Sequence, residues 1–197
     1  MAYSKIDIFN MALNHLSITA PIATNSMNKD SRAIILNNFY ETARDEVLKA
    51  FDWGFANTYK VLTLSTEKSP IAKFPYVYDC PNDCIAARAL IDNIKGEERK
   101  FQVFSNSQGE KCFLAEIECA YLRYTRRVEK EDLFEPEFAL VLSFYLAALA
   151  GETITGQQKK AESCLQKYEL KLRKAKQLNA QEGAAEDEDN SQYYDVR

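Results

Sequence analysis

The chain carries, at residues 39–56, the stretch Phe39-Tyr-Glu-Thr-Ala-Arg-Asp-Glu-Val-Leu-Lys-Ala-Phe-Asp-Trp-Gly-Phe-Ala56. Tyr40, Ala43 and Val47 recur at the spacing of one face of a helix, so the stretch predicts the second half of an amphipathic helix over 30–52. The only tryptophan follows this helix at once, and Gly54 is expected to end it. A long helix therefore leads into an aromatic junction at the start of the next part of the fold.

Working outward, three more helices are predicted, at 4–17, 136–151 and 155–178. Ser4 is placed to cap the first, and Pro136 suits the first position of the third. Residues 138–150 are apolar nearly all round, which predicts a central helix. This run of 13 residues is shorter than the ~20 that span a bilayer. The short link at 151–155 predicts that the last two helices pack antiparallel.

Between the second and third helices, a β insertion is predicted over about 58–127. Alternating or β-rich runs at 61–64, 101–104, 111–114 and 120–125 indicate strands, the last three as an antiparallel meander. The run 85–94 is ambiguous between helix and strand, and we favour a strand for its start. Ser105-Asn-Ser-Gln-Gly109 predicts a hairpin turn, and Cys80-Pro-Asn-Asp83 predicts a turn with proline second.

These elements predict an α+β fold: a helical bundle of about four helices with a small antiparallel β-sheet and an extended acidic C-terminal tail. The expected organisation is one domain over 1–180, followed by the tail at 181–197. Residues 182–197 hold six acids and one arginine, so removing their net −5 from the whole-chain −4 leaves the body at +1. A near-neutral body is not typical of a dedicated nucleic-acid binder.

Composition argues against most cofactor chemistry, and no cofactor is expected. His15 is the single histidine, which we interpret as a packing or hydrogen-bonding residue. Only six glycines are present, and none form a phosphate-binding loop. The odd count of five cysteines suggests reduced thiols and assembly in the cytoplasm, and no signal peptide or membrane partner is expected. A zinc site at Cys80, Cys84, Cys112 and Cys119 is the weaker alternative to buried thiols.

Four segments, in order, resemble the head-to-tail adaptor family of short-tailed bacteriophages, the tail tubular protein A-like proteins. The segments are Ile6–Leu16, Tyr40–Leu48 running into Trp53–Ala56, Tyr76–Cys84, and Phe134–Phe138 leading into Leu146–Ala150 and Thr153–Thr155. Each segment alone is a weak signal, and their order and spacing make the resemblance more specific. The acidic tail is not part of the shared pattern.

The resemblance implies a structural virion protein of the tail or neck, assembled in the host cytoplasm. It would form a homo-oligomeric ring, usually of twelve copies, between the portal protein and the tail nozzle protein. Such a ring extends the channel through which genomic DNA passes without sequence-specific binding. A ring needs heterologous interfaces, in which one flank of each subunit fits the opposite flank of the next.

The resemblance and the residue patterns single out three groups of residues. The structural signature is Arg44, Asp45, Trp53, Phe55, Tyr76, Tyr78, Pro81 and Asp83. A possible portal-docking anchor at the end of the tail is Tyr193, Tyr194 and Val196. A possible channel or partner contact is Arg123, Arg126 and Arg127, for which a solvated strand end neutralised by nearby acids is the favoured interpretation.

Within the signature, Arg44 is expected to form a bidentate ion pair or to cap carbonyls near 76–78. Trp53, Phe55, Tyr76 and Tyr78 are expected to form one aromatic cluster. No catalytic residue is expected. The main alternative is a virion-associated enzyme that degrades cell wall or polysaccharide, because paired carboxylates such as Glu116 with Glu118 are common in the chain. A helical DNA-packaging factor is a third, weaker alternative.

Overall fold

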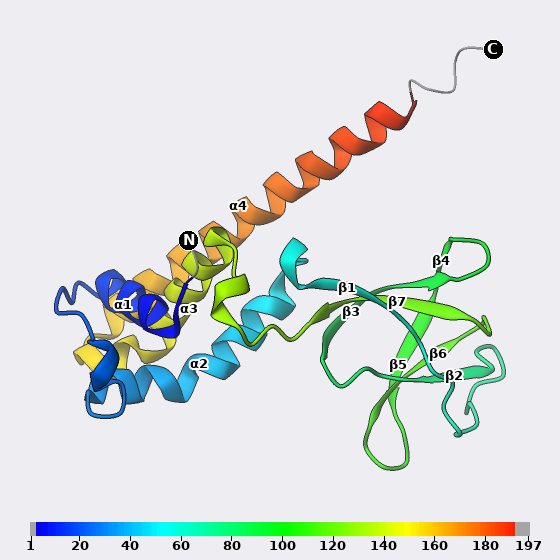
Figure 1. The fold of residues 1–197 in the computed structure, drawn as a ribbon, viewed down its shortest axis with the longest axis horizontal. Coiled ribbons are helices and arrows are strands. Elements are labelled where there is room, and N and C mark those ends of the chain that lie inside the picture. Colours follow the sequence, from blue (N-terminus) through cyan, green and yellow to red (C-terminus); the bar gives the residue numbers. More distant parts are fainter. Residues whose placement is uncertain (1–2, 192–197) are drawn as a thin grey trace. The chain divides into compact units, whose positions relative to one another are not determined.

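The computed structural model describes the backbone of residues 3–191 and the side chains of residues 3–177. It divides into two compact units, one made of Met1–Val47 with Lys130–Arg197 and the other of Leu48–Glu129. Within the described residues, the first unit holds helices and the second holds two small antiparallel sheets, so the predicted α+β class is confirmed (Figure 1).

The helical unit contains α1 (Lys5–His15), most of α2 (Ser31–Ala50), α3 (Pro136–Thr155) and α4 (Gln158–Ser191), with short 3₁₀ turns η1 (Thr24–Ser26) and η3 (Glu131–Leu133). The predicted cap of α1 is confirmed. Ser4 and Asp7 form a capping box, in which each side chain accepts a hydrogen bond from the other residue's backbone N–H, at 3.3 and 2.9 Å. Pro136 occupies the first turn of α3, as expected.

Helix α3 is the centre of the helical unit, as its apolar sequence predicts. It packs against both α1 and α4, and most of its residues from Phe138 to Gly151 are buried. By length and composition α3 could also cross a membrane, but 56% of its most apolar window is buried inside the fold. Burial of that kind is what a core helix of this bundle needs.

The predicted end of this helix at residue 151 is wrong. Helix α3 continues to Thr155, and Gly156, in the left-handed conformation with φ 67°, ends it. The Thr155 hydroxyl donates to the Gly151 carbonyl at 2.6 Å, so the polar last turn satisfies its own backbone. Gly151 lies inside the helix and does not end it. Its missing side chain lets α3 pack closely against Leu16, because a Cβ at this position would lie 2.8 Å from Leu16 Cδ2. Helix α4 consequently starts at Gln158 rather than at 155.

The predicted role of Gly54 is also wrong. Helix α2 ends at Ala50, and Gly54 lies in a separate 3₁₀ turn, η2 (Gly54–Ala56), without a positive φ. The acidic tail at 181–197 stays a prediction, because side chains from 178 on and the whole of residues 192–197 lie outside the described part of the chain.

The second unit contains β1 (Asn57–Val61), β2 (Tyr76–Asp79), β3 (Cys84–Asp92), β4 (Glu98–Arg99), β5 (Phe101–Ser105), β6 (Lys111–Ala115) and β7 (Ala120–Arg126). One sheet has the order β1-β7-β3-β4 and the other has the order β2-β6-β5. The predicted strand start at 85 is confirmed, since β3 covers Cys84–Asp92. Gly109 has φ 82° in the β5–β6 turn, which confirms the predicted hairpin.

The predicted single meander of three strands is wrong at its last step. Strands β5 and β6 pair as expected, but β7 pairs with β1 and β3 in the other sheet. Because β7 directly follows β6 in sequence, pairing of these two strands was the natural expectation. In the structure β7 pairs with β3, in a register that buries Ala120, Leu122 and Tyr124 on one face. The predicted alternation of these three side chains is itself confirmed.

The two sheets join into a small barrel. The chain that leaves β1 donates from Leu62 N to the Ala120 carbonyl, and then crosses to β2, where Ser65 N donates to Val77 O at 2.8 Å and Asp79 N to Thr63 O at 3.1 Å. On the opposite side, β4 runs into β5 with one residue between them. Adjacent strands around the ring are thus linked by pairing or by continuous chain (Figure 1).

The barrel interior is a single hydrophobic cluster. Its fully buried members include Tyr78, Leu90, Phe113 and Leu122, drawn from four different strands. The Tyr78 hydroxyl is satisfied inside this cluster by donating to the Ile117 carbonyl at 2.7 Å. A second, smaller cluster, Phe74 with Val77, Cys112 and Leu114, lies on the other face of the β2-β6-β5 sheet. Together these two clusters fix the positions of β2, β3 and β6.

Candidate functional site

Arg44 and Asp45, the predicted signature pair of α2, interact with each other. Arg44 is 6% exposed, and its Nε and Nη2 both reach Asp45 Oδ1, at 3.0 and 2.9 Å. An ion pair is therefore present, as one of the two alternatives expected, although it uses one carboxylate oxygen rather than two. The pair links adjacent residues of one helix, so it orders the surface of α2.

Arg88 of β3 caps carbonyls at the end of α2, a different set from those near 76–78 that were expected for Arg44. Its Nη2 donates to the carbonyls of Leu48, Lys49 and Phe51 at 3.3, 3.2 and 2.6 Å, which are the last acceptors of α2 and its exit. A guanidinium is well placed at a helix C-terminus, where orphan carbonyls concentrate negative charge. Sequence reasoning missed Arg88, although an arginine inside the apolar run Ala86-Ala-Arg-Ala-Leu90 was the available signal.

Arg88 is also part of an ion network in the second unit. Its Nε donates to the buried Thr125 hydroxyl at 2.8 Å and lies 3.4 Å from Asp52 Oδ1. Asp52 in turn accepts from Arg123 at 2.6 Å through Oδ2. Asp52 therefore stands between two guanidinium groups and joins the exit of α2 to β7.

Arg123 and Arg126 do not share one face of the sheet. Arg123 forms an ion pair with Asp52 at 2.6 Å, an acid that the sequence-based prediction did not name. Arg126 lies three positions along the same regular strand, so the alternation of β7 directs it to the opposite face. Arg127 follows the strand, and its backbone N–H donates to Asp83 O at 2.7 Å.

The remaining signature residues are in the second unit. Trp53 is 2% exposed and packs edge-on against Phe51, with ring centroids 4.8 Å apart, while Tyr78 and Tyr76 belong to the barrel cluster. One common cluster of Trp53, Phe55, Tyr76 and Tyr78 stays a prediction. Asp83 accepts a hydrogen bond from the Tyr124 hydroxyl at 3.0 Å, which ties the turn before β3 to β7.

The turn containing Pro81 starts one residue later than predicted. Cys84 N donates to the Pro81 carbonyl at 2.9 Å, so proline is the first residue of this turn and Asn82 and Asp83 are its central pair. The predicted turn at 80–83 placed proline second. Because Cys80 N instead donates to Lys111 O, residue 80 still belongs to the pairing between β2 and β6.

Strand β1 presents an open edge along Asn57–Val61, because the chain pairs with β2 only after this strand, through Thr63 and Ser65. Among the described residues 3–191, it is the terminal strand of its sheet and pairs with β7 alone, and its residues Tyr59, Lys60 and Val61 are exposed. Tyr59 is 62% exposed and Val61 54% exposed, both large side chains on the same face of the strand. We refer to these three residues as the β1 edge. Unpaired backbone groups beside apolar side chains are a template for another chain.

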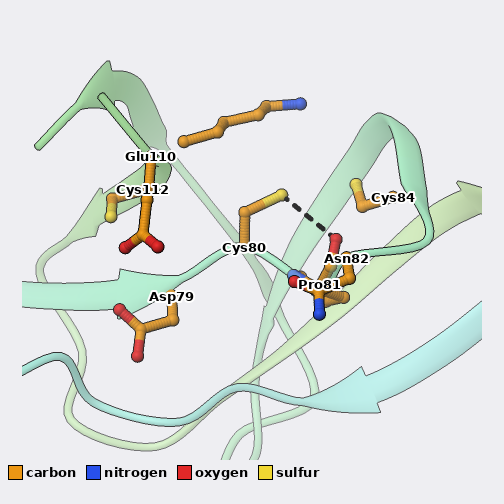
Figure 2. Close-up of a pocket in the computed structure, with 8 residues that line it drawn as sticks. Asp79, Cys80, Pro81, Asn82, Cys84, Glu110 and Cys112 are labelled. Carbon is orange, nitrogen blue, oxygen red and sulfur yellow. Dashed lines mark hydrogen bonds between the residues drawn. The ribbon is translucent and has the colours of Figure 1, made fainter. Parts of the chain in front are cut away.

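A pocket of about 420 Å³ lies beside the turn between β2 and β3. Its lining comes from β2, the turn and the β5–β6 hairpin and consists of Asp79, Cys80, Pro81, Asn82, Cys84, Glu110, Lys111 and Cys112 (Figure 2). A second hollow of about 250 Å³ adjoins the same turn and reaches Lys60–Thr63. The pocket is thus close to the β1 edge, with the Pro81–Asn82 segment shared by both hollows.

Two thiols of this pocket interact directly. A hydrogen bond from Cys84 is the main cause that lowers the pKa of Cys80 to about 7, with a smaller contribution from the charge of Lys111. The same hydrogen bond and burial raise the pKa of Cys84 far above its ordinary value. The protonated form of Cys80 also makes a weak contact with the Pro81 carbonyl, at 3.6 Å.

His15 has the packing and hydrogen-bonding role that was predicted. Its Nε2 lies 3.0 Å from the Ser143 hydroxyl, and its ring stacks on Phe144 with centroids 3.7 Å apart. Burial, with a smaller effect from the charge of Lys167, lowers the pKa of His15 to about 4. Among the side chains of residues 3–177, no three His, Cys, Asp or Glu residues gather in a way that could hold a metal ion.

The tail residues Tyr193, Tyr194 and Val196 lie outside the described residues. The chain matches no protein-family model and no curated protein. The resemblance to head-to-tail adaptors therefore remains a prediction from the sequence.

Proposed function

We propose that this protein is a structural subunit that assembles into a ring between the portal and the tail nozzle of a short-tailed phage. The observation that carries the proposal is the β1 edge. An open strand whose large side chains are more than half exposed offers both backbone hydrogen bonds and apolar area to a neighbour. Lys60 places one charge on this edge, of the kind that protects open strands in soluble monomers, but the exposed Tyr59 and Val61 on either side of it still offer apolar area to a neighbour.

A ring needs two different complementary surfaces on each subunit. The β1 edge supplies one of them. The exposed apolar residues elsewhere, such as Leu165 and Leu170 of α4 at 41% and 51% exposure, offer surface for the other contacts of a ring subunit. Permanent interfaces of this kind bury on the order of 2,000 Å² or more, so several such surfaces must contribute.

The near-neutral body of the chain suits a channel wall. The net +1 outside the acidic segment, with Arg123 paired to Asp52, leaves little excess positive charge to hold phosphates. Since phosphate contacts dominate non-specific affinity for DNA, a weakly charged wall lets the genome pass. This supports contact with genomic DNA in passage and not a dedicated DNA-packaging factor.

The test is the mass of the purified protein, measured alone and with portal rings from the same particle. We expect a soluble subunit alone and cooperative ring formation on the portal. Replacing Tyr59 and Val61 together by lysine should abolish ring formation while circular dichroism stays unchanged, because charge on the edge blocks strand pairing. Ile94→Lys is the matched control, since Ile94 is 84% exposed in the turn between β3 and β4, away from the β1 edge. This variant should assemble as the parent chain does.

Two results would overturn the proposal. One is a doubly substituted β1 edge that assembles on the portal as well as the parent chain does. The other is turnover of peptidoglycan or polysaccharide by a soluble monomer, abolished by a single Glu→Gln substitution, which would favour the enzymatic alternative.

A further inference from the structure

We propose that Cys80 and Cys84 form a hydroperoxide-responsive thiol pair, in which Cys80 is oxidised first and Cys84 then closes a disulfide across the Pro81–Asp83 turn. This inference does not depend on the proposed assembly role. It rests on the pocket beside the turn, on the contact between the two thiols, and on the charged groups that surround them.

The turn positions the two thiols. Cys80 directly follows β2, Cys84 begins β3, and the hydrogen bond from Cys84 N to the Pro81 carbonyl brings the two strand ends together. Both side chains line the same pocket, and Cys84 is the neighbour that lowers the pKa of Cys80 most. Figure 2 shows both sulfur atoms on the same side of the turn, beside the pocket. A small oxidant can reach them there, because both residues are partly exposed.

The groups that face Cys80 favour its thiolate. The hydrogen bond from Cys84 is the main cause that lowers the pKa of the Cys80 thiol, and the charge of Lys111, on β6, lowers it further, while burial and the Asp83 carboxylate raise it. The balance lowers the pKa of Cys80 to about 7, which favours the nucleophilic thiolate more than in a free cysteine. Asp79 and Glu110 also line the pocket. Cys84 keeps its proton, so the two thiols have distinct roles.

One molecule of hydroperoxide oxidises the two thiols to a disulfide, a two-electron step in which the peroxide is reduced. The Cys80 thiolate attacks the terminal oxygen of hydrogen peroxide, an S–O bond forms, the O–O bond breaks, and hydroxide leaves. The Cys84 sulfur then attacks Cys80, an S–S bond forms, and the S–O bond breaks. The leaving hydroxide takes the Cys84 proton and departs as water. A thiol reductant restores both thiols by exchange.

The other thiols lack this arrangement. Cys112 and Cys164 are each 1% exposed, so an oxidant has little access to them. Cys119 is exposed and is the competing site for any oxidant. For this reason the experiment uses the full chain with Cys119→Ser, a residue outside the pocket. In a reducing cytoplasm a disulfide of this type is transient, as in redox-sensing proteins.

Tryptic peptides separate the candidates. Cleavage after Lys73 and Arg88 releases a peptide, 74–88, whose only cysteines are Cys80 and Cys84, whereas Cys112 lies in peptide 112–123. After brief hydrogen peroxide treatment and alkylation with iodoacetamide, we expect peptide 74–88 to be two hydrogens lighter and unalkylated. Dithiothreitol should restore full alkylation. A doubly alkylated peptide 74–88 after hydrogen peroxide treatment that oxidises the cysteine of an unstructured peptide in the same sample would overturn the proposal.

Single substitutions test the order of the two steps. In Cys84→Ser, which keeps a hydroxyl donor beside Cys80, peroxide should leave a sulfenic acid on Cys80 that dimedone traps. In Cys80→Ser, dimedone should label nothing in peptide 74–88. Labelling of Cys84 in Cys80→Ser, or no labelling of Cys80 in Cys84→Ser, would refute the assigned roles.

A rate measurement on the unsubstituted pair avoids any effect on folding. At pH 7 a thiol with a pKa near 7 has about 16 times the thiolate fraction of a free cysteine, and its lower nucleophilicity reduces this to an alkylation rate about threefold faster. Iodoacetamide should therefore modify Cys80 about three times faster than the cysteine of an unstructured peptide. A rate at or below that of the peptide would contradict the proposal.

Discussion

Replacement of Arg88 by methionine should destabilise the second unit more than any other single loss of charge within it. The substitution keeps most of the apolar stem and removes the guanidinium that holds the carbonyls of Leu48, Lys49 and Phe51. It also leaves the Thr125 hydroxyl, which is fully buried, without the donor that lies 2.8 Å away. The expected effect is local to the exit of α2 and its junction with β3 and β7.

The magnitude follows from these partners. A hydrogen bond to a charged group contributes about 1.5–3 kcal/mol, and an unsatisfied buried polar group costs about 1–3 kcal/mol. Water can reach part of the carbonyl set, because Lys49 is exposed, and Arg123 still neutralises Asp52. We therefore expect a loss of about 3 kcal/mol in the free energy of unfolding, most of it from Thr125 and the Phe51 carbonyl.

The assay is urea unfolding followed by the fluorescence of Trp53, which packs on Phe51 and is the only tryptophan. This probe lies in the second unit, which matters where two units can unfold separately. Arg88→Lys keeps the charge with fewer donors and should lose about half as much. Lys100→Met removes an exposed charge in the same unit and should change stability by less than about 0.5 kcal/mol. If Arg88→Met shifted the unfolding midpoint no more than Lys100→Met, the capping argument would be wrong.

Three further predictions concern the helical unit and the tail. The pKa of His15 is about 4 in the folded protein, below its unfolded value of 6.5, so neutral His15 contributes fully to stability above pH 6.5, and this contribution falls as the pH drops toward 4. His15→Gln should remove this part of the pH dependence, which amounts to up to about 3 kcal/mol in the free energy of unfolding. The measurement is the urea unfolding midpoint of both chains at pH 7 and at pH 4.5. Gly151→Ala should lower stability by about 1 kcal/mol or more in thermal unfolding, because the overlap with the buried Leu16 exceeds the gain in helix propensity; a more stable variant would contradict the packing seen here. Deleting residues 181–197 should leave the circular dichroism spectrum of the body intact but weaken docking to portal rings; equal docking of the shortened chain would exclude an anchor in the tail.

The helices were largely predictable because their signals are local. A serine cap followed by an acid three residues later, a proline in the first turn, and an apolar run of helical length each act within one or two turns of chain. The wrong predictions concern the C-terminal ends of α2 and α3. Thr155 extends α3 through a hydrogen bond to its own helix, and α2 ends before Gly54 at carbonyls that Arg88 holds from 37 to 40 residues away in sequence.

The sheets were predictable in part as strands but not as a barrel. The sequence pattern identified β3, β5, β6 and β7, and the buried face of β7 at Ala120, Leu122 and Tyr124. The strand predicted at 61–64 is wrong, because β1 is Asn57–Val61, and neither β2 nor β4 was predicted. Alternation does not identify the neighbouring strand, since several registers bury the same side chains. The choice of β3 and β1 over β6, and the crossing of the chain after β1 to β2, depend on closing the ring around Tyr78 and Phe113.

The sequence by itself determined the class of fold, the central helix, the solitary histidine as a packing residue, and the resemblance on which the ring proposal draws. Only the tertiary structure decided that Arg88 caps α2, that Asp52 lies between two arginines, that β1 has an open edge, and that two cysteines meet across a turn. The physical reason is the distance along the chain over which each interaction acts. Propensity, capping and periodicity act over a few residues, whereas ion pairs, strand order and the pKa of a thiol depend on groups that the chain brings together only by folding.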